Sequence, residues 1–301
     1  MDAAIRFINV SYAFGALAAV KDITLDIHPG EMIGLVGPDG SGKTTLARLA
    51  AGALAPARGK VEPESRGRVG YLTGRYSLYA DLTVWENIRF FGRVYGMSSA
   101  QLTAEGQRLL EWVGLWPFKD RLSGLLSGGM RQKLALACAL VHQPPVLVLD
   151  EPTTAVDPVA RADFWDLLRS QAEQGRAVLV TTPYMDEAER CHKVGLLHQG
   201  ELLAFDQASA LKERLPWQMA LLKPSDGLTP NRLEAVRVAG ELRGQRWVQP
   251  QGAGVRVALE SGTPLVAPPG YELAPVASNL EDVYIWLSGA AEEVGQDEPR
   301  N

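Results

Sequence analysis

The sequence has little cysteine and no long apolar run, and each shortage excludes a class of protein. Only two cysteines occur, Cys138 and Cys191, without a C-x-x-C spacing, which excludes a disulfide scaffold or a zinc site and indicates a reducing compartment. The longest apolar runs, such as 134–141, are far too short to span a bilayer. The N-terminus lacks the basic start and apolar stretch of a signal peptide. We therefore expect a cytoplasmic protein that reaches a membrane only through a partner.

An excess of basic residues is also missing. The chain has 30 Lys and Arg against 35 Asp and Glu, a formal net charge of −5. This balance provides no electrostatic footprint for nucleic acid, and we expect no such partner. The hydrophobic fraction of 46% is ordinary for a globular protein, and 301 residues suffice for two domains or for one large α/β domain with an appendage.

A glycine-rich loop lies between an apolar run at 32–36 and a helix-forming segment at 45–51. The loop follows the pattern G-x-x-x-x-G-K-T and reads Gly37, Pro38, Asp39, Gly40, Ser41, Gly42, Lys43, Thr44, Thr45. Glycines let such a loop turn tightly and point its amide groups at a polyphosphate, which the helix dipole also favours. Lys43 can reach the β- and γ-phosphates, and the Thr44 hydroxyl can hold Mg²⁺. The loop predicts a nucleoside-triphosphate site.

Two further motifs follow this loop. The segment 126–132, here called the signature segment, opens an amphipathic helix that runs through Leu140. At the start of that helix, a hydroxyl and backbone amides form a second candidate anion site, at Ser127, Gly128 and Gly129.

The other motif is a buried strand that ends in two carboxylates. The apolar run 146–149 leads directly into Asp150, which is placed to hold Mg²⁺. Glu151 follows and is placed to act as general base for an attacking water.

One aromatic residue near the loop has two interpretations. Phe14 precedes Gly15 on a predicted loop between strands at 5–10 and 23–27. It can stack on an adenine ring or belong to the core, and these residues alone favour the core.

In this order and spacing, the three motifs resemble those of an ATP-binding-cassette (ABC) ATPase domain, over about residues 5–205. The resemblance implies an α/β fold: a P-loop NTPase core at 1–205 with a helical subdomain at about 75–140. A small α+β accessory domain at 206–289 resembles the one in multidrug-type exporter subunits. Residues 290–301 are expected to be a disordered tail or a linker.

Local signals predict some elements of these regions. Thr83, followed three residues later by Glu86, forms a capping box that predicts a helix from Val84 to Tyr95, and a second helix is expected at about 102–113. The segment 246–260 predicts a hairpin with its turn at 252–254.

The resemblance also implies roles. One Mg·ATP is served by Lys43, Thr44, Asp150 and Glu151, and Phe14 matches the adenine-stacking aromatic, which reverses the interpretation above. Two such domains pair head to tail, so that the signature segment covers the ATP of a second cassette, which can be identical, different or fused. The loop at Asp157 matches the segment that signals between the two ATP sites.

The helical subdomain matches the part that receives a transmembrane permease, which implies peripheral association with the inner membrane. Aromatic residues there, such as Trp85 and Trp112, either pack the subdomain or contact that partner, and packing is the simpler interpretation.

Two positions depart from the family pattern. Gly74 replaces a glutamine that contacts Mg²⁺ and the attacking water, and Pro183 replaces the switch histidine. None of the four histidines occupies a substitute position: His28, His142, His192 and His198. Either other groups such as Thr182, Tyr184 or water compensate, or this chain is the impaired half of an asymmetric pair that completes its partner's site. The second is our hypothesis.

The sequence therefore predicts the ATP-hydrolysing subunit of an ABC transporter, in the export direction. A ribosome-associated cassette protein is the alternative from another class, and the acidic balance disfavours it. A regulatory cassette that never hydrolyses ATP is the third interpretation, and the intact Asp150 and Glu151 argue against it.

Overall fold

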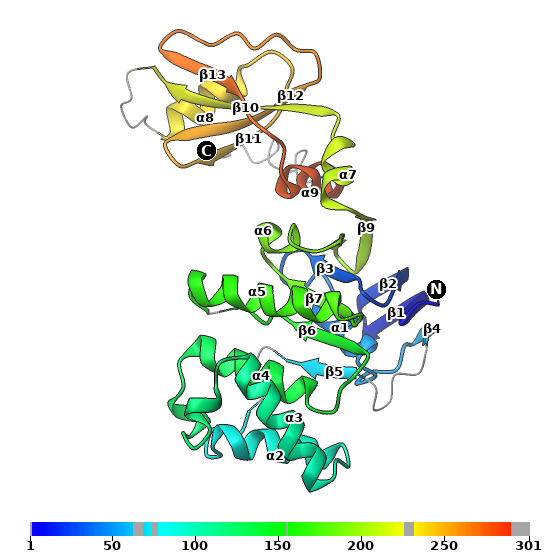
Figure 1. Cartoon of the computed structure of the whole chain (residues 1–301). Helices are drawn as coiled ribbons and strands as arrows, with labels where there is room; N and C mark the ends of the chain where they lie inside the picture. The colour runs from blue at the N-terminus through cyan, green and yellow to red at the C-terminus, as the bar shows by residue number, and fades with distance from the viewer. Residues whose placement is uncertain (1, 63–68, 74–77, 155, 226–231, 290–301) are drawn as a thin grey trace. The chain divides into compact units, whose positions relative to one another are not determined.

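The computed structural model describes residues 2–62, 69–73, 78–154, 156–225 and 232–289 (Figure 1). Gly74 and the predicted tail at 290–301 lie outside the described residues. The chain forms two compact units, residues 1–206 and 207–301, and each is described by itself.

A six-stranded sheet forms the centre of the first unit. Its strands, in spatial order, are β5 (Val69–Leu72), β6 (Val146–Asp150), β7 (Ala177–Thr182), β3 (Met32–Val36), β8 (Lys193–His198) and β9 (Glu201–Asp206). The paired strands are parallel except at the edge, where β9 runs antiparallel to β8. The predicted α/β core is therefore confirmed, and β3, which precedes the glycine-rich loop, lies inside the sheet.

Both faces of this sheet are buried, which explains its continuous apolar strands. Side chains alternate between faces along a strand, and β6 shows this directly. Val146 and Val148 pack in one core cluster with α1 (Lys43–Ala50) and a smaller sheet. Leu147 and Leu149 pack in a second cluster with α4 (Gly128–Leu140) and α5 (Pro158–Glu173). The layered packing holds the carboxyl ends of the strands in register.

The smaller sheet is antiparallel and has the order β2-β1-β4. Its strands are β1 (Ile5–Phe14), β2 (Leu17–Ile27) and β4 (Arg58–Glu62). Phe14 pairs with Leu17 across the turn, where Gly15 has φ 58°. The predicted loop around Phe14 is thus wrong: this residue ends a strand of a hairpin. Irregular register between Phe7 and Ala13 lets β1 extend beyond the alternating segment at its start.

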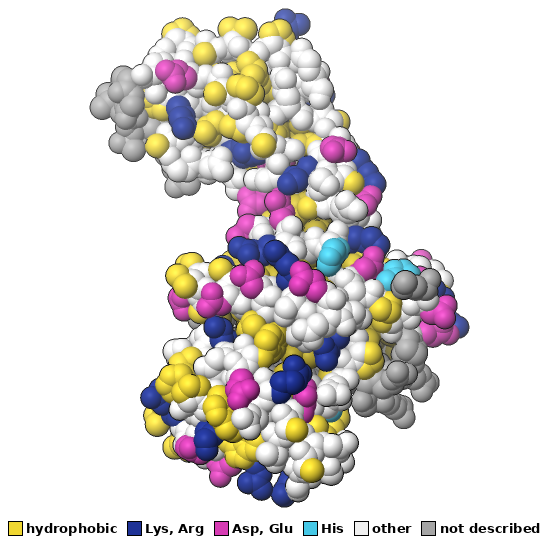
Figure 2. Space-filling view, in the orientation of Figure 1, with side chains coloured by type: hydrophobic (Ala, Val, Ile, Leu, Met, Phe, Trp, Pro, Cys, Tyr) yellow, Lys and Arg dark blue, Asp and Glu magenta, His cyan; other side chains and the backbone are white. Residues whose placement is uncertain are grey.

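Helices α2 (Val84–Val94), α3 (Ser99–Trp112) and α4 form the helical part of this unit, with short 3₁₀ turns at Trp116–Phe118 and Ser123–Leu125. The helix predicted from Val84 is confirmed, and Thr83 and Glu86 exchange the two hydrogen bonds of a capping box. Among the described residues of this part, six large hydrophobic side chains are exposed: Tyr79, Phe90, Val94, Tyr95, Leu122 and Leu125. Figure 2 shows hydrophobic side chains mixed with charged ones over this part.

The second unit is a four-stranded antiparallel sheet with helices. Its elements are α7 (Ala208–Glu213), β10 (Trp217–Pro224), α8 (Arg232–Gly240), β11 (Gln245–Gln251), β12 (Gly254–Glu260), β13 (Tyr271–Pro275) and α9 (Leu280–Ser288). The sheet order is β11-β12-β10-β13, and the hairpin predicted at 246–260 is confirmed. A buried ion pair joins Arg256 of β12 to Asp282 of α9.

Two expectations from composition can be compared with the structure. Cys138 and Cys191 are free and buried, and burial raises the pKa of both thiols, which makes them unreactive. Within the described ranges, no helix combines the length and apolarity needed to cross a membrane.

Candidate nucleotide-binding site

The glycine-rich loop joins the end of β3 to the start of α1, as the sequence predicts. Gly42 has φ 105°, a left-handed conformation that favours glycine, and it directly precedes the first helical residue, Lys43. A Cβ at Gly37 would collide with the carbonyl oxygen of Leu197, and one at Gly42 with that of Ala19. The loop is therefore confined by β8 and β2, and glycine is required at both positions.

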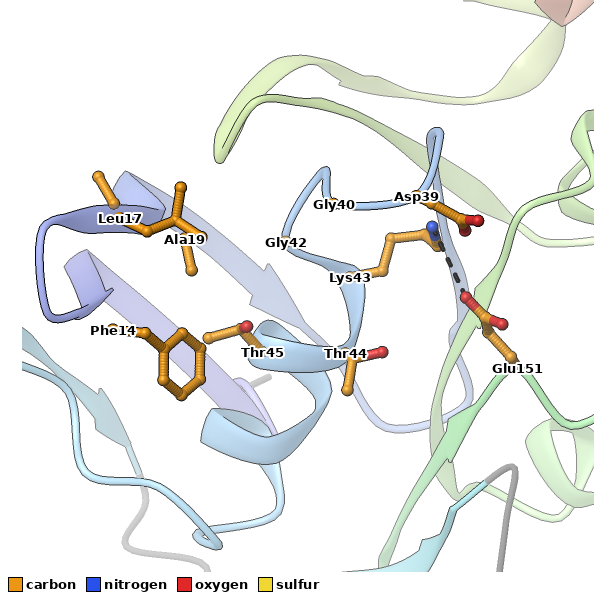
Figure 3. Close-up of a pocket in the computed structure, with 11 residues that line it drawn as sticks. Phe14, Leu17, Ala19, Asp39, Gly40, Gly42, Lys43, Thr44, Thr45 and Glu151 are labelled. Atoms are coloured by element: carbon orange, nitrogen blue, oxygen red, sulfur yellow. Dashed lines mark ion pairs between the residues drawn. The ribbon is translucent and has the colours of Figure 1, made fainter.

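Lys43 is buried inside the loop that it follows. Its side chain is only 3% exposed, and Nζ donates hydrogen bonds to the carbonyl oxygens of Gly37 (2.9 Å) and Pro38 (3.0 Å). The same Nζ lies 3.6 Å from Oε1 of Glu151, an ion pair drawn in Figure 3. The site thus holds a compact positive charge opposite a carboxylate.

Asp150 and Glu151 lie at the end of β6, near the start of α1. Oδ1 of Asp150 accepts hydrogen bonds from the Thr44 hydroxyl (3.0 Å) and the Thr181 hydroxyl (2.7 Å). Glu151 has φ 50°, uncommon for a residue with a side chain, and its carboxylate is 28% exposed. The neighbouring Tyr71 of β5 has a pKa raised first by its burial and then by the charge of Asp150, so its hydroxyl stays protonated.

A cleft of about 250 Å³ lies over the loop and is shown in Figure 3. The residues that line it are Phe14, Leu17, Ala18, Ala19, Asp39, Gly40, Gly42, Lys43, Thr44, Thr45 and Glu151. Phe14 is 47% exposed and is packed edge-on against Tyr12, with ring centroids 5.0 Å apart. The structure thus brings Phe14, the predicted adenine-stacking residue, to the same cleft as the residues predicted to bind phosphate.

Sequence reasoning missed two sets of residues at this site. Leu17, Ala18 and Ala19 line the cleft because the β1–β2 hairpin places them beside Phe14, and the misassigned loop concealed this. Thr181 was missed because it lies far from the motifs in the chain. Its pairing with Asp150 across parallel strands brings the two together. A pair of threonines ending the apolar run 177–180 was the available signal.

The signature segment lies elsewhere and does not line this cleft. Ser127 is exposed and forms the N-cap of α4, where its hydroxyl accepts from the Met130 amide (3.3 Å). Gly128 is partly exposed, whereas Gly129 is buried against α5, where an added Cβ would lie 2.6 Å from that of Ala160. Packing of α4 against α5 therefore also requires glycine at position 129.

Pro183 directly follows β7. The preceding Thr182 hydroxyl donates to Oε2 of the buried Glu187 (2.6 Å) and accepts from the Tyr184 amide (3.1 Å). Thr182 therefore has no hydroxyl hydrogen left for a phosphate, which removes it as a donor in place of the histidine. None of the four histidines, all within the described residues, lines the cleft.

The side chains present fit a magnesium-bound triphosphate. The Ser41 hydroxyl in the loop is buried and makes no hydrogen bond with the described residues, so it retains capacity for a ligand. Among the described residues, no group of three or more His, Cys, Asp and Glu forms a complete metal site. Mg²⁺ does not need one, because it is often held by one or two carboxylates, waters and substrate phosphates. The side chains that would hold Mg²⁺ here are Thr44 and Asp150.

A strand–loop–helix phosphate site inside a largely parallel sheet, with a carboxylate at the end of a nearby strand, defines a P-loop NTPase. Comparison with known proteins narrows this class. The ABC transporter family model matches residues 20–154. The Nod factor export ATP-binding protein I of Cupriavidus metallidurans is 34% identical over 306 residues, covering 96% of this chain and 98% of that protein. The chain therefore belongs to the ATP-binding proteins of ABC transporters, a family of ATPases.

Two further comparisons agree with this family. The probable multidrug ABC transporter ATP-binding protein YbhF of Escherichia coli is 37% identical over 290 residues. The match covers 91% of this chain but 50% of that protein, so the chain spans about half the length of this relative. A solved ATP-binding subunit of an ABC transporter has 28% identity and a TM-score of 0.62, covering 70% of this chain and 92% of that one. The predicted family and fold class are confirmed.

Proposed function

We propose that this chain binds and hydrolyses Mg·ATP as the energy-supplying subunit of a membrane exporter. The observation that carries the proposal is the convergence of Lys43, Thr44 and Glu151 at one cleft in a chain of this family. Asp150 lies directly behind the cleft, hydrogen-bonded to the Thr44 hydroxyl. The export direction is supported by the relative from Cupriavidus metallidurans, which is named as a Nod factor export protein.

In this proposal each group has a separate task. Lys43 and the loop amides bind the phosphates, and Phe14 stacks on the adenine. Thr44 and Asp150 hold Mg²⁺, which neutralises charge on the phosphates. Glu151 accepts a proton from the attacking water. Because Lys43 is paired with Glu151 at 3.6 Å, nucleotide binding must draw the ammonium toward phosphate, and this frees the carboxylate for its role.

The partners are a second cassette and a transmembrane permease at the inner membrane. The exposed Ser127 hydroxyl and the start of α4 support a site offered to the second cassette. The exposed aromatic and aliphatic side chains of the helical part, including Phe90 and Tyr95, support permease docking there. Residues 206–289 form the accessory domain in this proposal.

We further propose that this chain's own ATP site is impaired while its signature segment completes the partner's site. Pro183 has no ionisable group and no backbone donor, and Thr182 does not substitute for it. The hydroxyl and glycines of the signature segment are all present. The other departure, Gly74, lies outside the described residues.

Binding of ATP by the purified chain tests the first proposal. Titration of Mg·ATP is compared between wild type, Lys43→Ala and a matched surface control, Lys60→Ala, whose lysine is 61% exposed. We expect binding to be lost only in Lys43→Ala. Equal affinity in all three proteins would contradict the site.

Turnover of the assembled complex tests the asymmetry. Lys43→Ala or Glu151→Gln in this chain is compared with the equivalent changes in the partner cassette. The hypothesis expects substitutions in the partner to abolish turnover and those here to leave a measurable part. It fails if both sets abolish turnover equally. Copurification with ribosomes instead of membrane proteins would favour the non-transport alternative.

A further inference from the structure

One buried hydroxyl contacts both acidic residues of the site and has no other use. Thr181 is the penultimate residue of β7 and is fully buried, with 0% of its surface exposed. Its hydroxyl donates to Oδ1 of Asp150 at 2.7 Å and accepts from the backbone amide of Glu151 at 3.0 Å. A hydroxyl has one hydrogen to donate, so the donor of this group is committed to Asp150, while its oxygen holds the amide of Glu151.

The backbone at Glu151 requires such support. Its φ of 50° lies in the left-handed region, which costs free energy for a residue with a side chain. The Glu151 amide is held twice by Thr181, by the hydroxyl and by the carbonyl oxygen at 3.1 Å. The turn that aims the carboxylate of Glu151 into the cleft is therefore fixed from β7.

The carboxylate of Asp150 is oriented by the same hydroxyl. Oδ1 receives two hydroxyl hydrogens, from Thr44 and Thr181, whereas Oδ2 receives no hydrogen bond from the described residues. Thr44 also has to offer its oxygen to the metal, but Thr181 is not at the cleft and has no second task. Thr181 thus determines which oxygen of Asp150 remains available.

We propose that Thr181 is a positioning residue, whose single hydroxyl sets the carboxylate of Asp150 for Mg²⁺ and the turn of Glu151 for water activation. The inference rests on the proposed function, since it concerns the same Mg·ATP site. The switch histidine that would follow β7 is replaced by Pro183, but β7 still contributes to the site through Thr181.

The adjacent residue provides a matched control. Thr182 is equally buried at 0% exposure, and its hydroxyl donates to Glu187 instead of to the site. Side chains alternate along a strand, which explains why two consecutive threonines serve different carboxylates. Thr182→Val removes a hydroxyl of the same kind from the same strand without touching Asp150 or Glu151.

The experiment measures ATP affinity of the full chain with and without Mg²⁺, using a fluorescent ATP analogue, for wild type, Thr181→Val, Thr181→Ser and Thr182→Val. Thr181→Val keeps the shape and the β-branched side chain but removes the hydroxyl, whereas Thr181→Ser keeps the hydroxyl. We expect Thr181→Val to bind the analogue normally in EDTA. The Mg²⁺ concentration needed to tighten binding should rise about tenfold, as expected for one lost hydrogen bond to a charged group.

Thr181→Ser should restore the wild-type Mg²⁺ dependence, and Thr182→Val should leave it unchanged even if its melting temperature falls. Turnover of this chain's own site at saturating ATP, measured in a complex whose partner cassette is inactivated, should fall about tenfold or more in Thr181→Val alone, with little change in KM. If Thr181→Val does not fold, Thr181→Ala replaces it, because removing atoms cannot create a clash.

The inference is overturned if Thr181→Val has wild-type Mg²⁺ dependence and turnover. It is also overturned if Thr181→Ser is as impaired as Thr181→Val, since packing would then be the cause. An equal shift in Thr182→Val would have the same meaning, because the effect would be general to β7. Failure of the wild-type chain to bind the analogue at all would instead contradict the proposed function, and the inference with it.

Discussion

Each unit of this protein contains a buried group of charged residues, and the two groups are bonded differently. In the second unit, Arg256 donates to both carboxylate oxygens of Asp282 (2.8 and 2.6 Å) and to the carbonyl oxygen of Ala277 (2.7 Å). Asp282 also accepts from the Asn279 amide at 2.8 Å, and its own amide donates to the Asn279 side chain at 2.9 Å. The charged groups of this network are therefore bonded to one another and to nearby backbone and side-chain groups, and we call it the closed network.

The charged group in the first unit lies beside a hydroxyl whose hydrogen-bonding capacity is unfilled, and we call this group the open network. Lys43 is held by two loop carbonyls and lies 3.6 Å from Glu151, and the buried Ser41 hydroxyl has no hydrogen-bond partner among the described residues. A closed network stabilises one structure, whereas unfilled hydrogen-bonding capacity beside a cleft indicates a ligand. The comparison explains why one buried network is assigned to function and the other to stability.

The largest expected effect tests the open network. Lys43→Ala should reduce turnover at this chain's own ATP site, measured in a complex whose partner cassette is inactivated, by about 10³-fold, because the proposed charge on the transferring phosphoryl group is removed. Its melting temperature should stay close to that of wild type, since Lys43 serves the loop and not the core. Turnover assays and thermal unfolding measure the two effects. A large loss of stability with intact turnover would reverse the comparison.

The closed network predicts the opposite pattern. Asp282→Asn leaves the buried Arg256 without its counter-charge and should lower the free energy of unfolding of the second unit by about 3–5 kcal/mol. ATP binding by the first unit should be unchanged. Urea unfolding measures the loss, and Glu281→Gln, at the exposed neighbouring position, is the control. Comparable destabilisation in the control would show that the ion pair is not responsible.

A gain of function would sharpen the description of the open site. Pro183→His returns an imidazole and a backbone amide to the end of β7 and should raise turnover at this chain's own site, measured in a complex whose partner cassette is inactivated, by about tenfold. Pro183→Ala returns only the amide and separates the two contributions. If neither variant exceeds wild type in steady-state turnover, the position does not limit this site.

The smallest effect concerns His142, which belongs to neither network. It is stacked on Tyr95, with ring centroids 3.6 Å apart, and burial lowers its pKa from 6.5 to about 4. The unfolded chain therefore binds the proton more readily than the folded chain. The contribution of His142 to the free energy of unfolding is fully present above pH 6.5 and is lost as the pH falls through 4. Because the ring is only partly buried, we expect this contribution to the free energy of unfolding to be about 1 kcal/mol. His142→Phe should lose this part of the acid sensitivity in urea titrations between pH 7 and pH 4, and identical profiles would contradict the prediction.

Local sequence signals predicted the elements with strong internal patterns. The phosphate loop, the Thr83 capping box and the hairpin at 246–260 are all confirmed because turn and cap chemistry is local. The second helix begins at Ser99, several residues before the predicted start at about 102. The cause is a capping box of Ser98 and Gln101 that the apolar periodicity does not reveal.

What the sequence did not predict depends on pairing between distant segments. The strand β4 was missed because its residues, Arg58–Glu62, are mostly polar and exposed, and only pairing with β1 makes them a strand. Thr181 was missed because its role depends on its register with Asp150 across two strands. The roles of the site residues and the domain boundaries remain predictions from the family.

The contact of Gly129 with Ala160 has a consequence for mutagenesis of the signature segment. Any side chain at Gly129 would press α4 away from α5, because both facing groups are short and cannot move aside. Loss of transport after Gly129→Ala would therefore combine a displaced helix with loss of the proposed phosphate contact. Ser127 is the more informative position, since its side chain is exposed and Ser127→Asn retains a helix cap while changing the group that we propose contacts the other cassette.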